Sequence, residues 1–554
     1  MKKSLISIVS ALAILIVLNF ISGWVYTRFD LTEDHRYTLS EEAINTVKTF
    51  EQPIIIDVLL DGNLPPEFIK LQTETRQLLE EFASKNNTIK FSFINPLEDA
   101  SQIDGTITDL QALGLTPAQI TVEENGKTSQ EIVFPWAMVN YNNKTVKVPL
   151  LKNKLGATTE ERVNNSVQHL EYAFADAFAK ISITEKKQIA VLKGNGELDD
   201  IHLADFLTSI KDYYNIGAIT LDSVATNPQN TLDQLKNYDL ALIAKPTEPF
   251  TDAEKYVLDQ YIVSGGKSMW LIDQVDMELD SLFNENGAAM ALPRDLNLND
   301  FFFKYGVRIN PNLVNDMYFT QIVLASGEGN ASEYNPVPWY YNPMVFSKND
   351  HPINNNLEAI RFQFANSIDT LANTYTKTVL LSSSPLSKLD GTPKQISLDL
   401  INTPPKKELY NKGNNPLAVL VSGKFTSAFA NRIKPITLKG ALDKGEKNQM
   451  LVVSDGDIIR NQIRNNRPLE LGYDKWTNNY YGNKEFLINA LNFLLDEKGL
   501  INIRNKKVAV PFLDTQKMTD QKTKWQLINI GLPVGLTLLF GAIFGYFRRR
   551  KYGA

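Results

Sequence analysis

The sequence predicts an α/β protein that is anchored in a membrane by two helices and carries two α/β domains between them. Three observations predict this class. Uncharged apolar runs occupy residues 4–26 and 525–547, and a run of about 20 such residues can cross the hydrocarbon core as a helix. Between the two runs, apolar strand-like segments alternate with segments of helical periodicity. The chain has 554 residues, more than one hydrophobic core usually serves, so several domains are expected.

The charges beside the two apolar runs predict the topology. Lys2 and Lys3 precede the first run, and the basic tail 548–554 follows the second. Because cytoplasmic flanks of membrane helices are rich in Lys and Arg, both ends of the chain, 1–3 and 548–554, are expected in the cytoplasm. The roughly 500 residues between the runs are then outside it. A cleaved signal peptide is the alternative interpretation of the first run, although no small-residue cleavage site follows it.

The second run carries four glycines with the spacing that is typical of close helix packing. They are Gly531, Gly535, Gly541 and Gly545. With about 100° per residue, all four fall within roughly 120° of one helix face. Glycines let another helix approach closely, so this face is predicted to pack on a partner or on the first span. The alternative is that a membrane helix simply tolerates glycine.

Residues 27–185 are predicted to form a first α/β domain outside the membrane. A strand at 53–62 leads to a helix opened by a Pro-Pro pair, and an alternating strand follows at 89–94. This β-α-β order has the look of a thioredoxin-like half, but without any cysteine in the chain a redox motif is excluded. Strands joined by tight turns and a long helix at about 159–181 complete the domain.

Residues 186–505 are predicted to form a doubly wound α/β domain. Near-continuous apolar strands such as 188–192 and 239–246 alternate with helical segments, a pattern that favours a parallel sheet buried on both faces. The stretch at about 280–440 is rich in Asn, Pro and aromatic residues, and we interpret it as an insertion with short strands. A polar linker, 506–524, leads from this domain to the second apolar run.

Composition excludes several classes of function. The net charge of -6 and the pI of about 5.6 argue against nucleic acid as a partner, because phosphate contacts need clustered Lys and Arg. The absence of cysteine excludes disulfides, a lipoprotein anchor and a Cys nucleophile. The histidines are far apart and show no ligand spacing; they are His35, His169, His202 and His351. The sequence therefore predicts no catalytic constellation, no metal site and no cofactor.

Three acidic residues are weak candidates for ligand binding. Glu197 lies in the turn 194–198, G-N-G-E-L, which lacks the third glycine of a dinucleotide fingerprint and the Gly-Lys of a P-loop. A plain structural turn and a small-molecule pocket at the carboxyl edge of the sheet both stay open. Asp273 and Asp455, the latter beside Asp457, follow predicted core strands. Carboxylates there can bind a cation or act as acids, and turn formers or caps are the alternative.

Longer segments carry resemblances to known proteins. "DLALIAKPTEPFTDAEKYVLDQYIVSGGKSMWLID" resembles the class I glutamine-amidotransferase-like fold, which is a flavodoxin-like sheet whose enzymes attack with a cysteine that this chain lacks. "RFDLTEDHRYTLS", "VLLDGNLPPEFIKLQTETRQLLEEF", "VVSDGDIIRNQ" and "YYGNKEFLINALNFLLDEKGLINIRNKKVAVPFLD" resemble the GldG family of gliding-motility-associated ABC transporter subunits of Bacteroidetes. Its large domain also resembles the GldG/intraflagellar-transport-52 class of domains. The second resemblance covers nearly the whole chain.

The GldG resemblance implies a non-catalytic subunit in the bacterial inner membrane, with both termini cytoplasmic and the bulk of the chain periplasmic. Its implied partners are a polytopic, GldF-like permease, a cytoplasmic, GldA-like ATPase that hydrolyses ATP, and the lipid bilayer. Two copies of the chain per complex are one expectation. The subunit would either bind a substrate or relay ATP-driven motion to periplasmic partners. A membrane-tethered periplasmic hydrolase that uses acidic residues and a pure structural scaffold are the alternatives.

Overall fold

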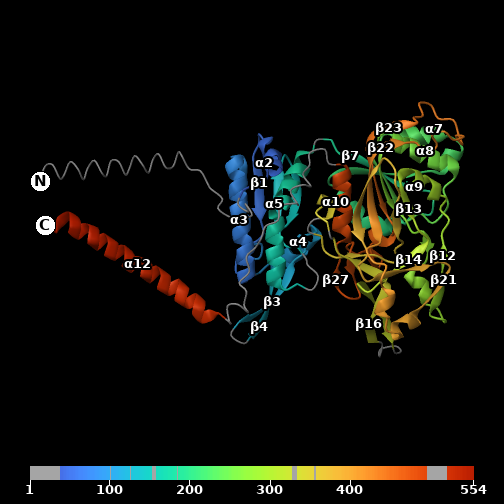
Figure 1. Cartoon of the computed structure of the whole chain (residues 1–554). Coiled ribbons are helices and arrows are strands. Elements are labelled where there is room, and N and C mark those ends of the chain that lie inside the picture. The colour runs from blue at the N-terminus through green and yellow to red at the C-terminus, as the bar shows by residue number, and fades with distance from the viewer. Residues whose placement is uncertain are drawn as a thin grey trace. The chain divides into compact units, whose positions relative to one another are not determined.

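A computed structural model of the chain describes residues 38–99, 101–124, 127–152, 157–183, 185–326, 333–347, 349–354, 357–495 and 521–553. These residues form a mixed α/β protein (Figure 1). The chain divides into two compact units, Met1–Lys507 and Val508–Ala554. The apolar run 4–26, predicted to be the first membrane span, lies outside the described residues, and so does most of the predicted linker 506–524.

The N-terminal part of the first unit is built on a four-stranded sheet. The strands lie in the order β2 (Ile89–Phe93), β1 (Ile54–Val58), β5 (Trp136–Tyr141) and β6 (Lys144–Pro149). β1 and β2 are parallel, whereas β5 runs antiparallel to both β1 and β6. Asn142 and Asn143 join β5 to β6 and both have positive φ, which is what a two-residue hairpin turn requires.

Three helices cover one face of this sheet. They are α2 (Glu41–Lys48), α3 (Pro66–Lys85) and α5 (Thr159–Ser182), and their apolar sides share one core with the strands. α5 begins with a capping box, in which Thr158 and Glu161 satisfy each other's backbone N–H groups. α4 (Ile103–Ala112) packs against a smaller cluster, and the hairpin of β3 (Ala118–Glu124) and β4 (Lys127–Val133) forms a separate sheet.

A seven-stranded sheet organises residues 187–453. Its order is β19 (Thr376–Ser382), β22 (Pro416–Thr426), β23 (Lys444–Val453), β10 (Lys267–Leu271), β9 (Leu240–Ala244), β7 (Lys187–Lys193) and β8 (Tyr214–Thr220). The five strands from β23 to β8 are parallel, and β22 and β19 extend the sheet antiparallel. β19 and β22 come from within the stretch 280–440 that the sequence predicts to be an insertion.

Both faces of this sheet are buried, as a doubly wound arrangement requires. One face packs on α7 (Pro228–Leu235), α8 (Asp252–Val263) and α9 (Asn299–Tyr305). The other face packs on α6 (Asp200–Ile210) and α10 (Asn483–Leu495). Successive residues of a strand contribute to opposite clusters, for example Ile243 to the first and Leu242 to the second, because side chains alternate across a strand.

Short strands between residues 275 and 397 form a β-rich extension, part of which has its own apolar cluster while other strands join the clusters of the main sheet. They are β11 (Val275–Asp276), β12 (Ala288–Pro293), β13 (Val307–Ile309), β14 (Asn312–Asp316), β15 (Phe319–Ser326), β16 (Glu333–Val345), β17 (Ile360–Arg361), β18 (Ile368–Thr370), β20 (Ser387–Gly391) and β21 (Lys394–Ser397). Two small hairpins follow the main sheet: β24 (Ile463–Arg464) with β25 (Arg467–Pro468), and β26 (Tyr473–Asp474) with β27 (Asn479–Tyr480).

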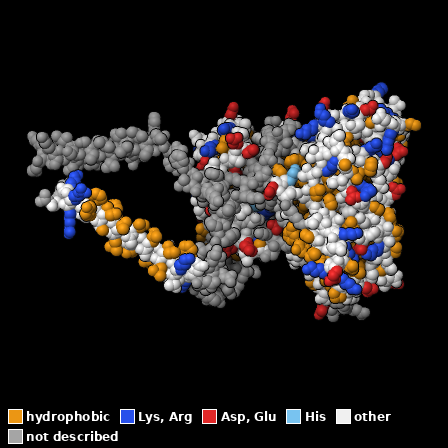
Figure 2. All heavy atoms as spheres, in the orientation of Figure 1, with side chains coloured by type: hydrophobic (Ala, Val, Ile, Leu, Met, Phe, Trp, Pro, Cys, Tyr) orange, Lys and Arg blue, Asp and Glu red, His pale blue; other side chains and the backbone are white. Residues whose placement is uncertain are grey.

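The second unit contains one long helix, α12 (Lys522–Tyr552), which includes the predicted span 525–547. Among the described residues it is the one helix long and apolar enough to cross a membrane. Figure 2 shows hydrophobic side chains along its surface and cations towards its ends. Such a helix can anchor the chain to a membrane.

Candidate functional site

The candidate site is built where three neighbouring parallel strands end. Ala244, Leu271 and Val453 close β9, β10 and β23, and they lie in register across the sheet. The residues that follow them therefore meet at one place on the carboxyl edge, which is where open α/β sheets usually hold ligands. Lys245 follows β9, and Asp273 follows β10 by two residues.

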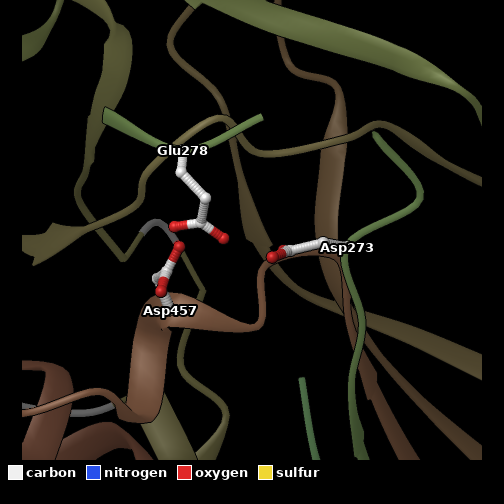
Figure 3. Close-up of side chains that lie close together, drawn as sticks. All are labelled: Asp273, Glu278 and Asp457. Atoms are coloured by element: carbon white, nitrogen blue, oxygen red, sulfur yellow. The ribbon is translucent and has the colours of Figure 1, made fainter. Parts of the chain in front are cut away.

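Lys245 lies at the centre of this edge with only 3% of its side chain exposed. Its Nζ lies 2.6 Å from carboxylate oxygens of Asp457 and Glu278, and 3.4 Å from one of Asp273. Figure 3 shows the carboxylates of these three residues converging. We call Lys245, Asp273, Glu278, Asp455, Asp457 and Arg460 the carboxyl-edge cluster.

The loop after β23 wraps around the lysine. The backbone N–H of Gly456 donates to Asp273 Oδ1 at 2.6 Å, and Asp455 accepts the N–H groups of Gln363 at 2.6 Å and Asp457 at 2.7 Å. A Cβ on Gly456 would lie 2.5 Å from Cγ of Lys245. The glycine in "SDGD" is therefore needed because the loop touches the lysine directly.

The backbone of Lys245 is also unusual, because its φ is +54°. This left-handed conformation is uncommon for a residue with a side chain and costs free energy. Its N–H still bonds the carbonyl of Leu271 at 2.9 Å, so the bend begins only after the strand is complete. The bend turns the side chain into the cluster.

The cluster reaches solvent on the side of Glu278 and Arg460, whose side chains are about one third exposed, at 35% and 32%. Nη1 of Arg460 lies 3.3 Å from both Glu278 and Asp457. Four carboxyl groups thus surround two cations. Buried ions of one sign are tolerated only when partners of the other sign are close, so the arrangement needs both cations.

Ion pairing keeps Lys245 and Asp457 in their charged forms. Burial opposes the charge on Lys245, but Asp457, Asp273 and Glu278 keep the pKa of its ammonium above the ordinary value. Burial alone would raise the pKa of Asp457, yet Lys245 and Arg460 hold it below the ordinary value. Lys245 and Asp457 therefore form a stable buried ion pair.

The other three carboxyl groups differ from Asp457, because their pKa values are raised. Burial, reinforced by the neighbouring carboxylates of Asp273 and Asp457, raises the pKa of Asp455 well above its ordinary value. Burial also raises the pKa values of Asp273 and Glu278, against the attraction of Lys245. With four carboxyl groups and two cations, Asp455 is the group that takes up a proton most readily.

Asp273, Glu278 and Asp457 also have the composition of a cation site, since one oxygen of each lies within 4.8 Å of the others. Hard divalent cations prefer such oxygen ligands. The ammonium of Lys245, however, already lies among these oxygens. The residues do not fit a divalent cation as long as Lys245 is present.

The three predicted ligand candidates do not all meet. Asp273 and Asp455 belong to one cluster. Glu197 lies instead in the turn after β7, where its Oε2 accepts the N–H of Asn195 at 2.8 Å, and burial raises its pKa. Gly194 and Gly196 shape this turn with φ of +115° and +70°. A ligand at Glu197, Asp273 or Asp455 stays a prediction.

Sequence reasoning missed Lys245, Glu278 and Arg460. The signal for Lys245 is present: a lysine follows the five-residue, fully buried strand Leu240–Ala244 without a spacer, and a charge in that place needs partners. Arg460 lies three residues after Asp457. Glu278 has no comparable signal, because its place depends on the loop after β10.

The predicted glycine face lies on α12, within the second unit. A Cβ built on Gly531, Gly535, Gly541 or Gly545 would meet nothing within 4 Å among the described residues. The face therefore has room for a neighbour at these positions. Its packing on another helix stays a prediction.

Residues 186–490 match the family described as "ABC-type uncharacterized transport system", and residues 33–140 match a domain of unknown function, DUF7088. No curated protein matches the chain. A similar solved structure is the "mmIFT52 N-terminal domain", with 13% identity, a TM-score of 0.32 and coverage of 58% of this chain and 100% of that one. The first match spans more than half of the 554 residues, and the chain belongs to this family of ABC-type transport systems.

Proposed function

We propose that the chain is a non-catalytic, membrane-anchored accessory subunit of an ABC transport complex. Membership of an ABC-type transport family supports an accessory role in such a system. The finer parts of the proposal are a bacterial inner-membrane location, a periplasmic bulk, association with gliding motility in Bacteroidetes, and a GldF-like permease and GldA-like ATPase as partners. The sequence contains no P-loop, so ATP hydrolysis is assigned to the partner.

The observation that carries the non-catalytic role is the filled carboxyl edge of the main sheet. Open α/β proteins usually bind small ligands there. In this chain Lys245 is 3% exposed and Asp455 0% exposed, and the ion pairs of Lys245 with Asp273, Glu278 and Asp457 lie where β9, β10 and β23 end. We therefore favour a relay of ATP-driven motion to periplasmic partners over capture of a ligand at this edge.

Two finer fold assignments belong to the same proposal. In chain order, the parallel strands of the main sheet lie as 2-1-3-4-5, which supports a flavodoxin-like domain. In the N-terminal sheet the order β2-β1-β5-β6, with a parallel pair followed by an antiparallel pair, supports the thioredoxin-like assignment. The class I glutamine-amidotransferase-like label would follow from the first of these.

The anchor is assigned to α12 and to the apolar run 4–26. The last turn of α12 contains Arg549, Arg550 and Lys551, and Trp525 lies near its other end. This distribution supports a cytoplasmic C-terminus. No described residue lies within 4 Å of a Cβ built on any of the four glycines of α12, which supports direct packing of this face against the permease.

The experiment is copurification of the full-length chain from membranes with the permease and the ATPase. Gly541→Leu together with Gly545→Leu should release the permease, because two large side chains would hold the helices apart. Phe540→Leu together with Ile543→Leu is the matched control on the opposite side of α12 and should leave the complex intact. Unchanged copurification of the glycine variant would refute this mode of assembly.

A second candidate, a periplasmic hydrolase, is favoured by one observation. The pKa of Asp455 is raised by burial and by neighbouring carboxylates, and such groups are often catalytic acids. If the chain were such an enzyme, Asp455→Ala with Asp273→Ala should abolish its function while the complex still assembles.

A further inference from the structure

Trp476 lies exposed at the tip of the β26–β27 hairpin, in a turn that hydrogen bonds hold in place. Trp476 is 54% exposed, which is high for so large an apolar side chain. Below it, Asp474 is 3% exposed and accepts the N–H of Trp476 at 3.2 Å and the hydroxyl of Thr477 at 2.7 Å. Because these bonds fix the turn, little conformational entropy remains to be lost when Trp476 meets a partner.

A second segment fixes the same turn from the side. Gln462 donates from Nε2 to Asp474 at 3.2 Å and accepts the N–H of Lys475 at 3.0 Å. Nζ of Lys475 donates to the carbonyl of Ile463 at 2.8 Å. The turn is therefore held to the β24–β25 hairpin and cannot fold Trp476 away without breaking these bonds.

Exposed rings and cations lie beside the tryptophan or on the two hairpins that hold its turn. The ring of Tyr334, 60% exposed, stacks on Trp476 with a centroid distance of 5.7 Å, and Tyr480 is 39% exposed. Nη2 of Arg464 bonds the carbonyl of Lys475 at 3.3 Å, and Arg467 lies opposite Arg464 in its hairpin. We call Tyr334, Arg464, Arg467, Lys475, Trp476 and Tyr480 the aromatic-cationic tip.

Acidic groups near the tip are mostly engaged. Asp474 is buried beneath it, and Glu470 lies 3.4 Å from the ammonium of Lys484. Glu333, next to Tyr334, is exposed. Among the described residues, the three cations Arg464, Arg467 and Lys475 outnumber Glu333 at the tip, and a basic surface suits a negatively charged partner.

We infer that the aromatic-cationic tip docks on anionic lipid headgroups of the membrane that α12 enters. Trp and Tyr combine an apolar ring with a polar group, and they concentrate at the headgroup level of bilayers. Arg and Lys beside them are attracted to anionic lipids.

The chain is long enough to allow this contact. Twenty-five residues, 496–520, separate the end of α10 from Gln521, and a chain of that length spans at most about 80 Å. α10 itself begins at Asn483, three residues after Tyr480. This inference rests on the proposed membrane anchoring by α12, so its test must report on both.

Fluorine NMR of tryptophans in the full-length chain reports on both. The chain is labelled with 5-fluorotryptophan and placed in lipid discs of phosphatidylcholine, with or without phosphatidylglycerol. Spin-labelled headgroups broaden signals from nearby rings. Trp525 on α12 reports on anchoring, Trp270, which is 0% exposed, serves as the buried reference, and Trp476 reports on docking. Trp→Phe substitutions assign the signals.

We expect Trp525 to broaden in all discs and Trp476 to broaden in discs with phosphatidylglycerol, less so at high salt. Each of Arg464→Glu and Arg467→Glu should reduce the docked population at least about fivefold, with unchanged thermal unfolding as the control for folding. A sharp Trp476 signal beside a broadened Trp525 overturns the inference alone. A sharp Trp525 signal overturns the anchoring. If the Trp476 signal broadens only when a copurified subunit is present, and does not depend on anionic lipid, the inference of lipid docking is also overturned.

Discussion

Lysines at the two edges of the main parallel sheet lie in opposite environments. At the carboxyl edge, Lys245 is buried among carboxylates 2.6 to 3.4 Å away. At the amino edge, Lys187, Lys236 and Lys267 line a cavity of about 630 Å³ together with Asp239. The same residue type fills one edge and borders an open cavity at the other. Because a buried ammonium needs compensating charge, Lys245 should matter more to the fold than the exposed Lys236.

The lysines at the amino edge do not by themselves make an anion site, because helix C-termini lie near them. α7 ends at Leu235 and α8 at Val263, next to residues that line this cavity. Helix C-termini carry partial negative charge, which cations nearby offset. Much of the positive charge at this edge is therefore already balanced by the fold.

The largest expected effect is that of Lys245→Met. The substitution leaves Asp273, Glu278 and Asp457 without their central cation, so the free energy of unfolding should fall by about 3–5 kcal/mol. Lys236→Met at the amino edge is the matched control and should change it by about 0.5 kcal/mol or less. Chemical denaturation of both variants measures the difference. Equal effects would remove the contrast between the edges.

Gly456→Ala should have an intermediate effect. Its new Cβ would lie 2.5 Å from Cγ of Lys245 and 3.0 Å from its Cα, so the loop or the lysine must shift, at a cost of about 1–3 kcal/mol. Gly391→Ala is the comparison, because a Cβ there meets nothing within 4 Å. A Gly456→Ala variant as stable as Gly391→Ala would show that the loop does not press on the lysine.

The smallest effect concerns the proton on Asp455. Its pKa is raised in the folded chain from about 3.9 when unfolded, so the unfolded state loses the proton first. The stability due to Asp455 is then complete below about pH 3.9 and is lost as the pH rises through the folded value. Asp455→Asn mimics the neutral group and should flatten this decline in a plot of melting temperature against pH. A decline of unchanged slope would assign it to another group.

Much of the fold follows from local patterns in the sequence. Buried strands such as β9, with its five apolar residues, and capped helices such as α8, opened by Thr251 and Glu254, are legible because hydrophobic period and cap chemistry are local properties. The place of β22 and β19 in the main sheet cannot be predicted in this way. Their membership of the main sheet depends on pairing with β23, and pairing between distant segments leaves no local signature.

Two acidic residues of the site could be predicted from the sequence, but the central lysine could not. Asp273 and Asp455 are found where acidic residues after parallel strands should meet. The sequence does not reveal that Lys245 pairs with Asp273, Glu278 and Asp457, because that depends on the register of β9 with β10 and on a positive φ at a lysine. The consequence is large, since the lysine places an ammonium among acidic residues that by themselves have the composition of a cation site.

The most direct test of the non-catalytic role is the double variant Asp273→Asn with Asp455→Asn in the full-length chain. It removes two carboxylates and leaves Asp457 and Glu278 to balance Lys245 and Arg460, so the fold should persist. We predict that the variant still copurifies with its transport partners and restores function in cells that lack the chain. An assembled complex without function would contradict the account, because it would show that these two acids act in catalysis or in ligand binding.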